Sequence, residues 1–177
     1  PAEEVGSGKA YLSRDGFFDD CDIALSWHPD TLNIVTTGSS LACMQTYFRF
    51  HGISSHAASA PHLGRSALDA VELMNVGANY LREHIEPQER VHYAITNTGG
   101  IAPNVVQSEA EVAYLVRSSS APKVRKLYER VCKIAKGAAM MTETSVDIMF
   151  DEGCSDTIPN YVLEDVLGES FNEIGVP

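Results

Sequence analysis

The stretch Met44-Gln45-Thr46-Tyr47-Phe48-Arg49-Phe50 decides the fold of this chain. Successive side chains of a β-strand point to opposite faces of a sheet, so every second residue from Met44 to Phe50 shares one face. That face carries Met44, Thr46, Phe48 and Phe50. The alternation predicts a half-buried strand at the start of a folded unit.

Two amphipathic helices are predicted after this strand. Between Arg65 and Glu83, small or apolar residues recur at three- and four-residue spacing, which predicts a helix with one buried stripe. The same spacing returns after Pro122, a residue suited to the first turn of a helix, and continues to Met141.

Three further strands are predicted at 91–96, 111–117 and 146–150, where apolar residues alternate with others. The glycine-containing segment 97–108 connects the first two. The resulting order is strand, helix, strand, strand, helix, strand. It predicts an α+β fold of the ferredoxin-like, split βαβ type, in which two helices cover one face of a four-stranded antiparallel sheet.

Turn-forming residues gather at 36–40 and 151–156, on either side of this unit. We therefore expect domain boundaries at 1–40, 41–153 and 154–177, with a helix over 161–174. Paired borders of this composition are typical of a two-stranded hinge, although two passive linkers fit the sequence equally well.

The adjacent acids Glu3 and Glu4 are the first candidate for chemistry. One carboxylate can bind a metal ion while its neighbour moves a proton, although two acids at the start of a helix also favour its positive end. The apolar run 22–27 predicts a buried strand that ends at His28, because Pro29 cannot continue the hydrogen-bond ladder. His28 is thereby expected at the sheet edge where α/β proteins place ligands.

Two loops are the other candidates. Small residues surround His56 in the segment 52–64, and Asn104 follows two glycines in the segment 97–106. Such loops let the backbone approach a ligand closely. A surface histidine and a tight turn are the simpler interpretations of the same residues.

Several of these stretches together resemble the M20 family of metallopeptidases and amidohydrolases, over nearly the whole chain. The resemblance rests on five segments: Pro1–Ala10, Trp27-His28-Pro29, Gly52–Gly64 around Ser55-His56-Ala57-Ala58, Ala67–Asn75, and Asn97–Val106. It implies that 41–153 is the lid or dimerisation domain, and that pieces of an α/β catalytic domain flank it.

The resemblance also implies roles for individual residues. Glu3 matches the general base of a two-metal site of zinc or manganese, and Glu4 and His28 match two of its ligands. His56 matches a histidine that reaches the active site of a partner subunit and stabilises the oxyanion. Asn104 and Arg117 are implied to bind the substrate, and the guanidinium of Arg117 is implied to pair with the carboxylate of the substrate. The implied assembly is a homodimer.

The substrate implied in the same way is an N-acyl amino acid, in its most specific form p-aminobenzoyl-glutamate. The family's early His-x-Asp motif, its metal-bridging Asp and its late ligand His have no counterpart in this sequence. We therefore expect the chain to be the middle of a longer protein and to be inactive alone. The alternatives are a module that only dimerises and a non-catalytic domain that binds a small ligand.

Composition limits the remaining possibilities. A net charge of -11 argues against nucleic-acid and anionic-membrane partners. The four cysteines are widely spaced and form no Cys-x-x-Cys pair, which favours reduced, mostly buried thiols in a cytoplasmic protein.

Overall fold

The computed structural model describes residues 8–176. They divide into two compact units. One unit comprises Leu41–Ser155; the other combines the chain up to Ser40 with the chain from Asp156 onward.

The larger unit contains one antiparallel sheet in the order β2-β3-β1-β4. Its strands are β1 (Ala42–His51), β2 (Arg90–Asn97), β3 (Glu109–Ser118) and β4 (Ser145–Cys154). Chain order and sheet order together define the split βαβ fold, so the predicted fold class is confirmed.

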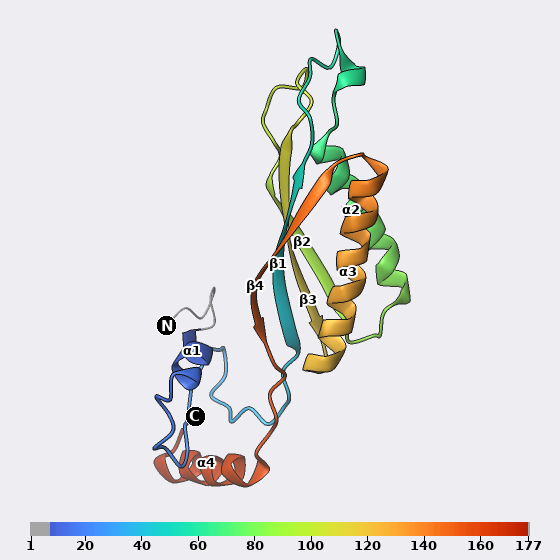
Figure 1. Cartoon of the computed structure of the whole chain (residues 1–177). Helices are drawn as coiled ribbons and strands as arrows, with labels where there is room; N and C mark the ends of the chain where they lie inside the picture. The colour runs from blue at the N-terminus through green and yellow to red at the C-terminus, as the bar shows by residue number, and fades with distance from the viewer. Residues whose placement is uncertain (1–7, 177) are drawn as a thin grey trace. The chain divides into compact units, whose positions relative to one another are not determined.

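Two helices cover one face of the sheet (Figure 1). They are α2 (Ala67–Leu81), which the short 3₁₀ turn η2 (Arg82–His84) extends, and α3 (Ala121–Met141). The hydroxyl of Ser66 accepts a 3.1 Å hydrogen bond from the backbone of Asp69 and caps the start of α2. No helix within residues 8–176 is long and apolar enough to cross a membrane.

The core lies between this sheet face and the helices. Phe48, Phe50 and Tyr114 are the largest side chains that the central strands bury, and Met74 and Leu127 meet them from the helices. Burying one large apolar side chain contributes roughly 1.5–3 kcal/mol to the free energy of unfolding. The alternation that predicted β1 and β3 therefore reflects a real division between the helix-covered face and the open face.

Strand β4 extends further than the sequence predicted. Residues 151–154 were expected in a flexible border, but Glu152, Gly153 and Cys154 pair with β1. Their acidic and glycine-rich composition is typical of a linker, yet the neighbouring strand supplies backbone partners for them. The ordered strand therefore continues to the last residues of the unit.

The flanking unit contains α1 (Gly8–Arg14) and α4 (Tyr161–Ile174). The helix predicted over 161–174 is confirmed. The strand predicted at 22–27 is wrong, because this segment has no strand partner among the described residues and Trp27 remains 85% exposed. A buried strand requires neighbours for its backbone groups.

Two hydroxyls join the segments that connect the units. Ser39 Oγ donates to the carbonyl of Thr157 at 2.7 Å, and Ser40 Oγ lies 2.7 Å from Thr157 Oγ1. The chain thus enters and leaves the larger unit through segments that touch each other.

The prediction of mostly buried thiols is wrong. Cys21 and Cys154 are exposed, and Cys43 and Cys132 are only half-buried. None of the four forms a disulfide in this structure.

Candidate functional site

Two loops leave the same end of the sheet and pair with each other (Figure 1). The segment 52–64 follows β1, and the segment 98–108 joins β2 to β3. Val106 N–H donates to Ser55 O at 3.0 Å, and Ala57 N–H donates to Asn104 O at 2.9 Å. A short antiparallel bridge between His56 and Val105 lies between these bonds, so the two predicted site loops form one structure.

Glycines permit the tight packing at the base of the first loop. A Cβ added to Gly52 would lie 2.0 Å from Arg65 O, and one added to Gly64 would lie 2.4 Å from Ser55 Oγ. Both distances are far below contact distance, so a side chain at either position would displace the loop.

Arg65 anchors the same base, and the sequence alone offered no reason to include it in the site. Its Nε donates to Glu143 at 2.6 Å, in the turn between α3 and β4. Its Nη1 donates to Gly64 O at 2.6 Å and to His62 O at 3.2 Å. The only signal in the sequence is its place directly after the last glycine of the loop.

The imidazole of His56 is oriented by its own loop. Its Nδ1 accepts the backbone N–H groups of Ala58 and Ser59, both at 3.2 Å. A neutral imidazole that accepts at Nδ1 carries its proton on Nε2. The side chain is exposed, so in this tautomer a ligand can reach the N–H donor at Nε2. Such a donor can stabilise negative charge on an oxygen.

Asn104 lies beside His56 in this loop pair, and its side chain is exposed. Arg117 does not join them. It lies near the far end of β3, eight residues after Glu109, which corresponds to about 27 Å along a strand. Within one chain, the two residues predicted to bind the substrate are therefore at opposite ends of the sheet.

Of the predicted metal residues, only His28 lies within the described part of the chain. Glu3 and Glu4 lie outside residues 8–176, and His28 is exposed in an irregular segment, with Nδ1 2.8 Å from Pro29 O. In the described part of the chain, no three His, Cys, Asp or Glu side chains lie close enough to hold a metal ion. These residues do not by themselves fit a two-metal centre.

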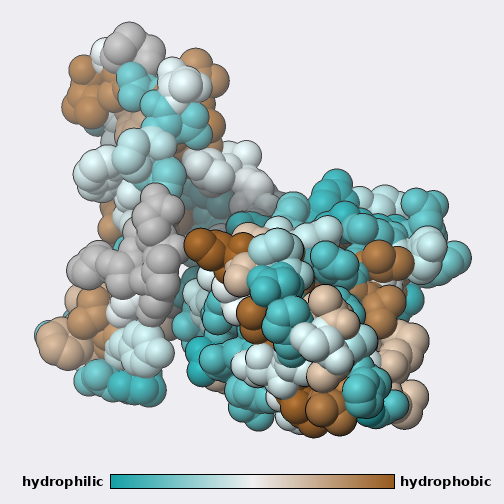
Figure 2. Space-filling view, turned by 90° about the horizontal axis from the view of Figure 1, so that it is seen from above, coloured by the Kyte–Doolittle hydropathy of each residue, from teal (hydrophilic) through white to brown (hydrophobic). Residues whose placement is uncertain are grey.

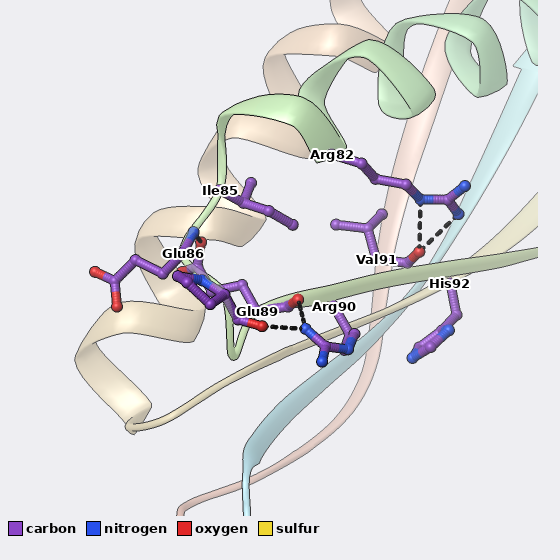
Figure 3. Close-up of a pocket in the computed structure, with 8 residues that line it drawn as sticks. Arg82, Ile85, Glu86, Glu89, Arg90, Val91 and His92 are labelled. Carbon is purple, nitrogen blue, oxygen red and sulfur yellow. Dashed lines mark hydrogen bonds between the residues drawn. The ribbon is translucent and has the colours of Figure 1, made fainter.

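Two open depressions of about 400 and 480 Å³ lie near the α2–β2 connection, away from the paired loops. The arginines in the first depression bind backbone oxygens (Figure 3): Arg82 donates twice to Val91 O, and Arg90 donates to Glu89 O. The buried carboxylate of Glu89 accepts from Ser118 Oγ and from the backbone of Glu86. These polar groups hold the connection in shape, which is a structural role.

Comparison with known proteins identifies the unit that carries the loops. Residues 43–140 match the peptidase dimerisation domain of the M20 family. The chain belongs to the M20 peptidase family. The matched M20 residues run from β1 almost to the end of α3, and include both paired loops.

Known M20 relatives match nearly the whole chain. It is 53% identical to one of the subunits of p-aminobenzoyl-glutamate hydrolase from Escherichia coli, over 100% of this chain and 37% of that protein. It is 32% identical to mouse Xaa-Arg dipeptidase, over 99% of this chain and 41% of that protein. The crystal structure of an aminobenzoyl-glutamate utilization protein from Klebsiella pneumoniae superposes with a TM-score of 0.60 at 26% identity, over 73% of this chain and 33% of that one.

The chain thus spans about two fifths of the length of these curated relatives. The names of these relatives describe a hydrolase and a dipeptidase.

Proposed function

We propose that this chain provides the dimerisation unit and a substrate-facing histidine of a hydrolase that cleaves the amide bond of an N-acyl amino acid. The proposed substrate is p-aminobenzoyl-glutamate, which the 53% identical relative is named for. The observation that carries the proposal is the exposed imidazole of His56, whose Nδ1 accepts from the backbone N–H groups of Ala58 and Ser59.

In this mechanism His56 acts on the reacting carbonyl group. As the carbonyl carbon is attacked, negative charge develops on its oxygen, and the Nε2–H donates to that oxygen. The exposed amide of Asn104 beside it binds the carboxylate or amide of the substrate. Because His56 and Asn104 are on paired loops, one rigid structure positions both groups.

The homodimer is proposed to form along β2 and α2. Exposed apolar side chains on these neighbouring elements include Ile95 on the strand, and Val76 and Tyr80 on the helix. Apolar residues reach the surface in several separate places (Figure 2), but those of β2 and α2 lie on neighbouring elements.

The opposite edge of the sheet is less suitable for a two-fold contact. There β4 packs beside α3, whose exposed residues include six bases and one acid: Lys123, Arg125, Lys126, Arg130, Lys133, Lys136 and Glu129. A two-fold axis brings a surface against its own copy, so this helix would face its own positive charge.

Family membership supports the remaining parts of the proposal. The proposed cofactor is two zinc or manganese ions, with Glu4 and His28 among the ligands and Glu3 as the general base. Arg117 remains a proposed contact for the substrate carboxylate. The proposed location is the cytoplasm, where thiols are kept reduced. The 177-residue chain by itself is proposed to be inactive.

Hydrolysis of p-aminobenzoyl-glutamate by the whole protein tests the proposal. His56→Ala should lower kcat by about 10²–10³-fold with little change in KM, because the donor acts mainly on the transition state. His62→Ala, in the same loop, is the matched control and should retain activity. Equal activity of the two variants would contradict the proposal, as would appreciable hydrolysis by the 177-residue chain that Glu3→Gln abolishes.

A further inference from the structure

Two cysteines that are 111 residues apart in sequence are direct neighbours in the sheet. Cys43, the second residue of β1, pairs with Cys154, the last residue of β4. Directly opposed residues of antiparallel strands have their Cα atoms about 4.5–5.5 Å apart and their side chains on the same face. Disulfides form across Cα distances of about 4.4–6.8 Å, so the backbone already meets this requirement.

A positively charged side chain lies next to the pair. Arg117 of β3 lies opposite Cys43 on its other side, so a guanidinium is the next group in the same row across the sheet. Positive charge stabilises the thiolate, which is the reactive form of cysteine. Burial raises the pKa of the Cys43 thiol, and the charge of Arg117 partly opposes that rise.

Access differs between the two thiols. Cys154 is exposed at the end of an edge strand, whereas Cys43 is half-buried in the strand beside it. An external reagent therefore meets Cys154 first.

We propose that Cys43 and Cys154 form a reversible disulfide by exchange with a small-molecule disulfide such as oxidised glutathione. The thiolate of Cys154 attacks one sulfur of the reagent, and a mixed disulfide forms as one small thiolate leaves. The thiolate of Cys43 then attacks the Cys154 sulfur and expels the second small thiolate. The two protein thiols lose two electrons and two protons, and the reagent is reduced to two thiols.

The bond would join β1 to β4 where the chain passes from the sheet into Ser155 and Asp156. Edge strands fray most readily at their ends, and β4 is an edge strand. Oxidation therefore fixes the end of β4, and reduction releases it.

The test uses the purified 177-residue chain with Cys21→Ser, because Cys21 is exposed and would react separately. The reduced protein is titrated with oxidised glutathione. Free thiols, intact mass, a peptide map and the melting temperature are then measured. We expect two thiols to disappear, about 2 Da to be lost, one Cys43–Cys154 cross-linked peptide to appear, and Tm to rise by at least about 5 °C.

Single cysteine variants show which thiols take part in the reaction. Cys132→Ser should behave like the parent, because Cys132 lies on α3 and is not part of the pair. Cys43→Ser should stop at the mixed disulfide on Cys154, and Cys154→Ser should react little. A parent protein that keeps glutathione on Cys154 while Cys43 stays reduced and the circular dichroism stays native would overturn the proposal. Cross-links that involve Cys132 would also overturn it.

Discussion

The hydroxyl of Tyr114 donates a 2.7 Å hydrogen bond to Asn75 Oδ1 and joins the centre of the sheet to α2. Both side chains are buried. Tyr114→Phe would leave the Asn75 oxygen without a donor, which should lower the free energy of unfolding by about 1–3 kcal/mol. Tyr93→Phe removes the same group from an exposed neighbour and should change it by less than about 0.5 kcal/mol. Urea denaturation of both variants measures the difference, and equal effects would refute this account.

The titration of Tyr114 should make the free energy of unfolding depend on pH in the alkaline range. Burial raises the pKa of Tyr114 well above its usual value, so the folded state keeps a proton that the unfolded state loses near pH 10. The unfolded state then binds fewer protons, and the free energy of unfolding falls as pH rises, by up to about 1.4 kcal/mol per pH unit for this group. Below about pH 9 the group has no effect. Denaturation midpoints between pH 8 and 11 should fall less steeply in Tyr114→Phe than in the parent.

Gly52 should resist substitution. Gly52→Ala places a methyl group against Arg65 O and should displace the loop of His56, with a loss of hydrolysis in the whole protein. Gly137→Ala is the control, because open space surrounds that position in α3 and alanine favours a helix by about 0.5–1 kcal/mol. Activity and melting temperature should therefore both fall for Gly52→Ala, and both should stay equal or rise for Gly137→Ala.

Mixing two inactive variants tests whether His56 acts across a dimer. In a mixed dimer of His56→Ala and Glu3→Gln, one of the two sites has an intact Glu3 and an intact His56 from the partner. Random pairing makes about half of the dimers mixed, so about one quarter of parental activity should return. Mixtures that remain as inactive as either variant would place His56 in the site of its own chain or outside catalysis.

Two variants distinguish the proposed dimer surface from the other edge of the sheet. Ile95→Lys adds a charge to the apolar β2 edge and should shift the whole protein toward monomer in sedimentation experiments. Phe150→Lys adds the same charge to an exposed apolar position on β4 and should leave the dimer intact. The reverse result would move the interface to the β4 edge.

The sequence predicted the larger unit well because its signals are local. Alternation in β1 and β3 and the stripes of α2 and α3 arise from burial on one face, which neighbouring residues reveal. The prediction of a strand at 22–27 was wrong, because an apolar composition does not by itself provide a partner strand. The sequence also ended β4 too early: residues 151–154 have a turn-forming composition, but their pairing with β1 keeps them in the strand.

The site was less accessible to sequence reasoning. His56 and Asn104 were recognised separately through family resemblance, and only the structure shows that their loops pair. The separation of Arg117 from both follows from its position on β3, which spacing alone does not relate to the loops. Cys43 and Cys154 were interpreted as scattered thiols because strand register, which brings them together, is a non-local property.

The contacts of Ser39 and Ser40 with Thr157 have a consequence for the history of this architecture. Since the chain leaves the flanking unit and returns to it at adjacent points, a short connection could replace the whole intervening segment without rerouting either flank. Insertions are tolerated where their two ends lie close together. The segment Leu41–Ser155 therefore has the geometry of an inserted domain, whose removal would leave two chain ends close enough to be joined directly.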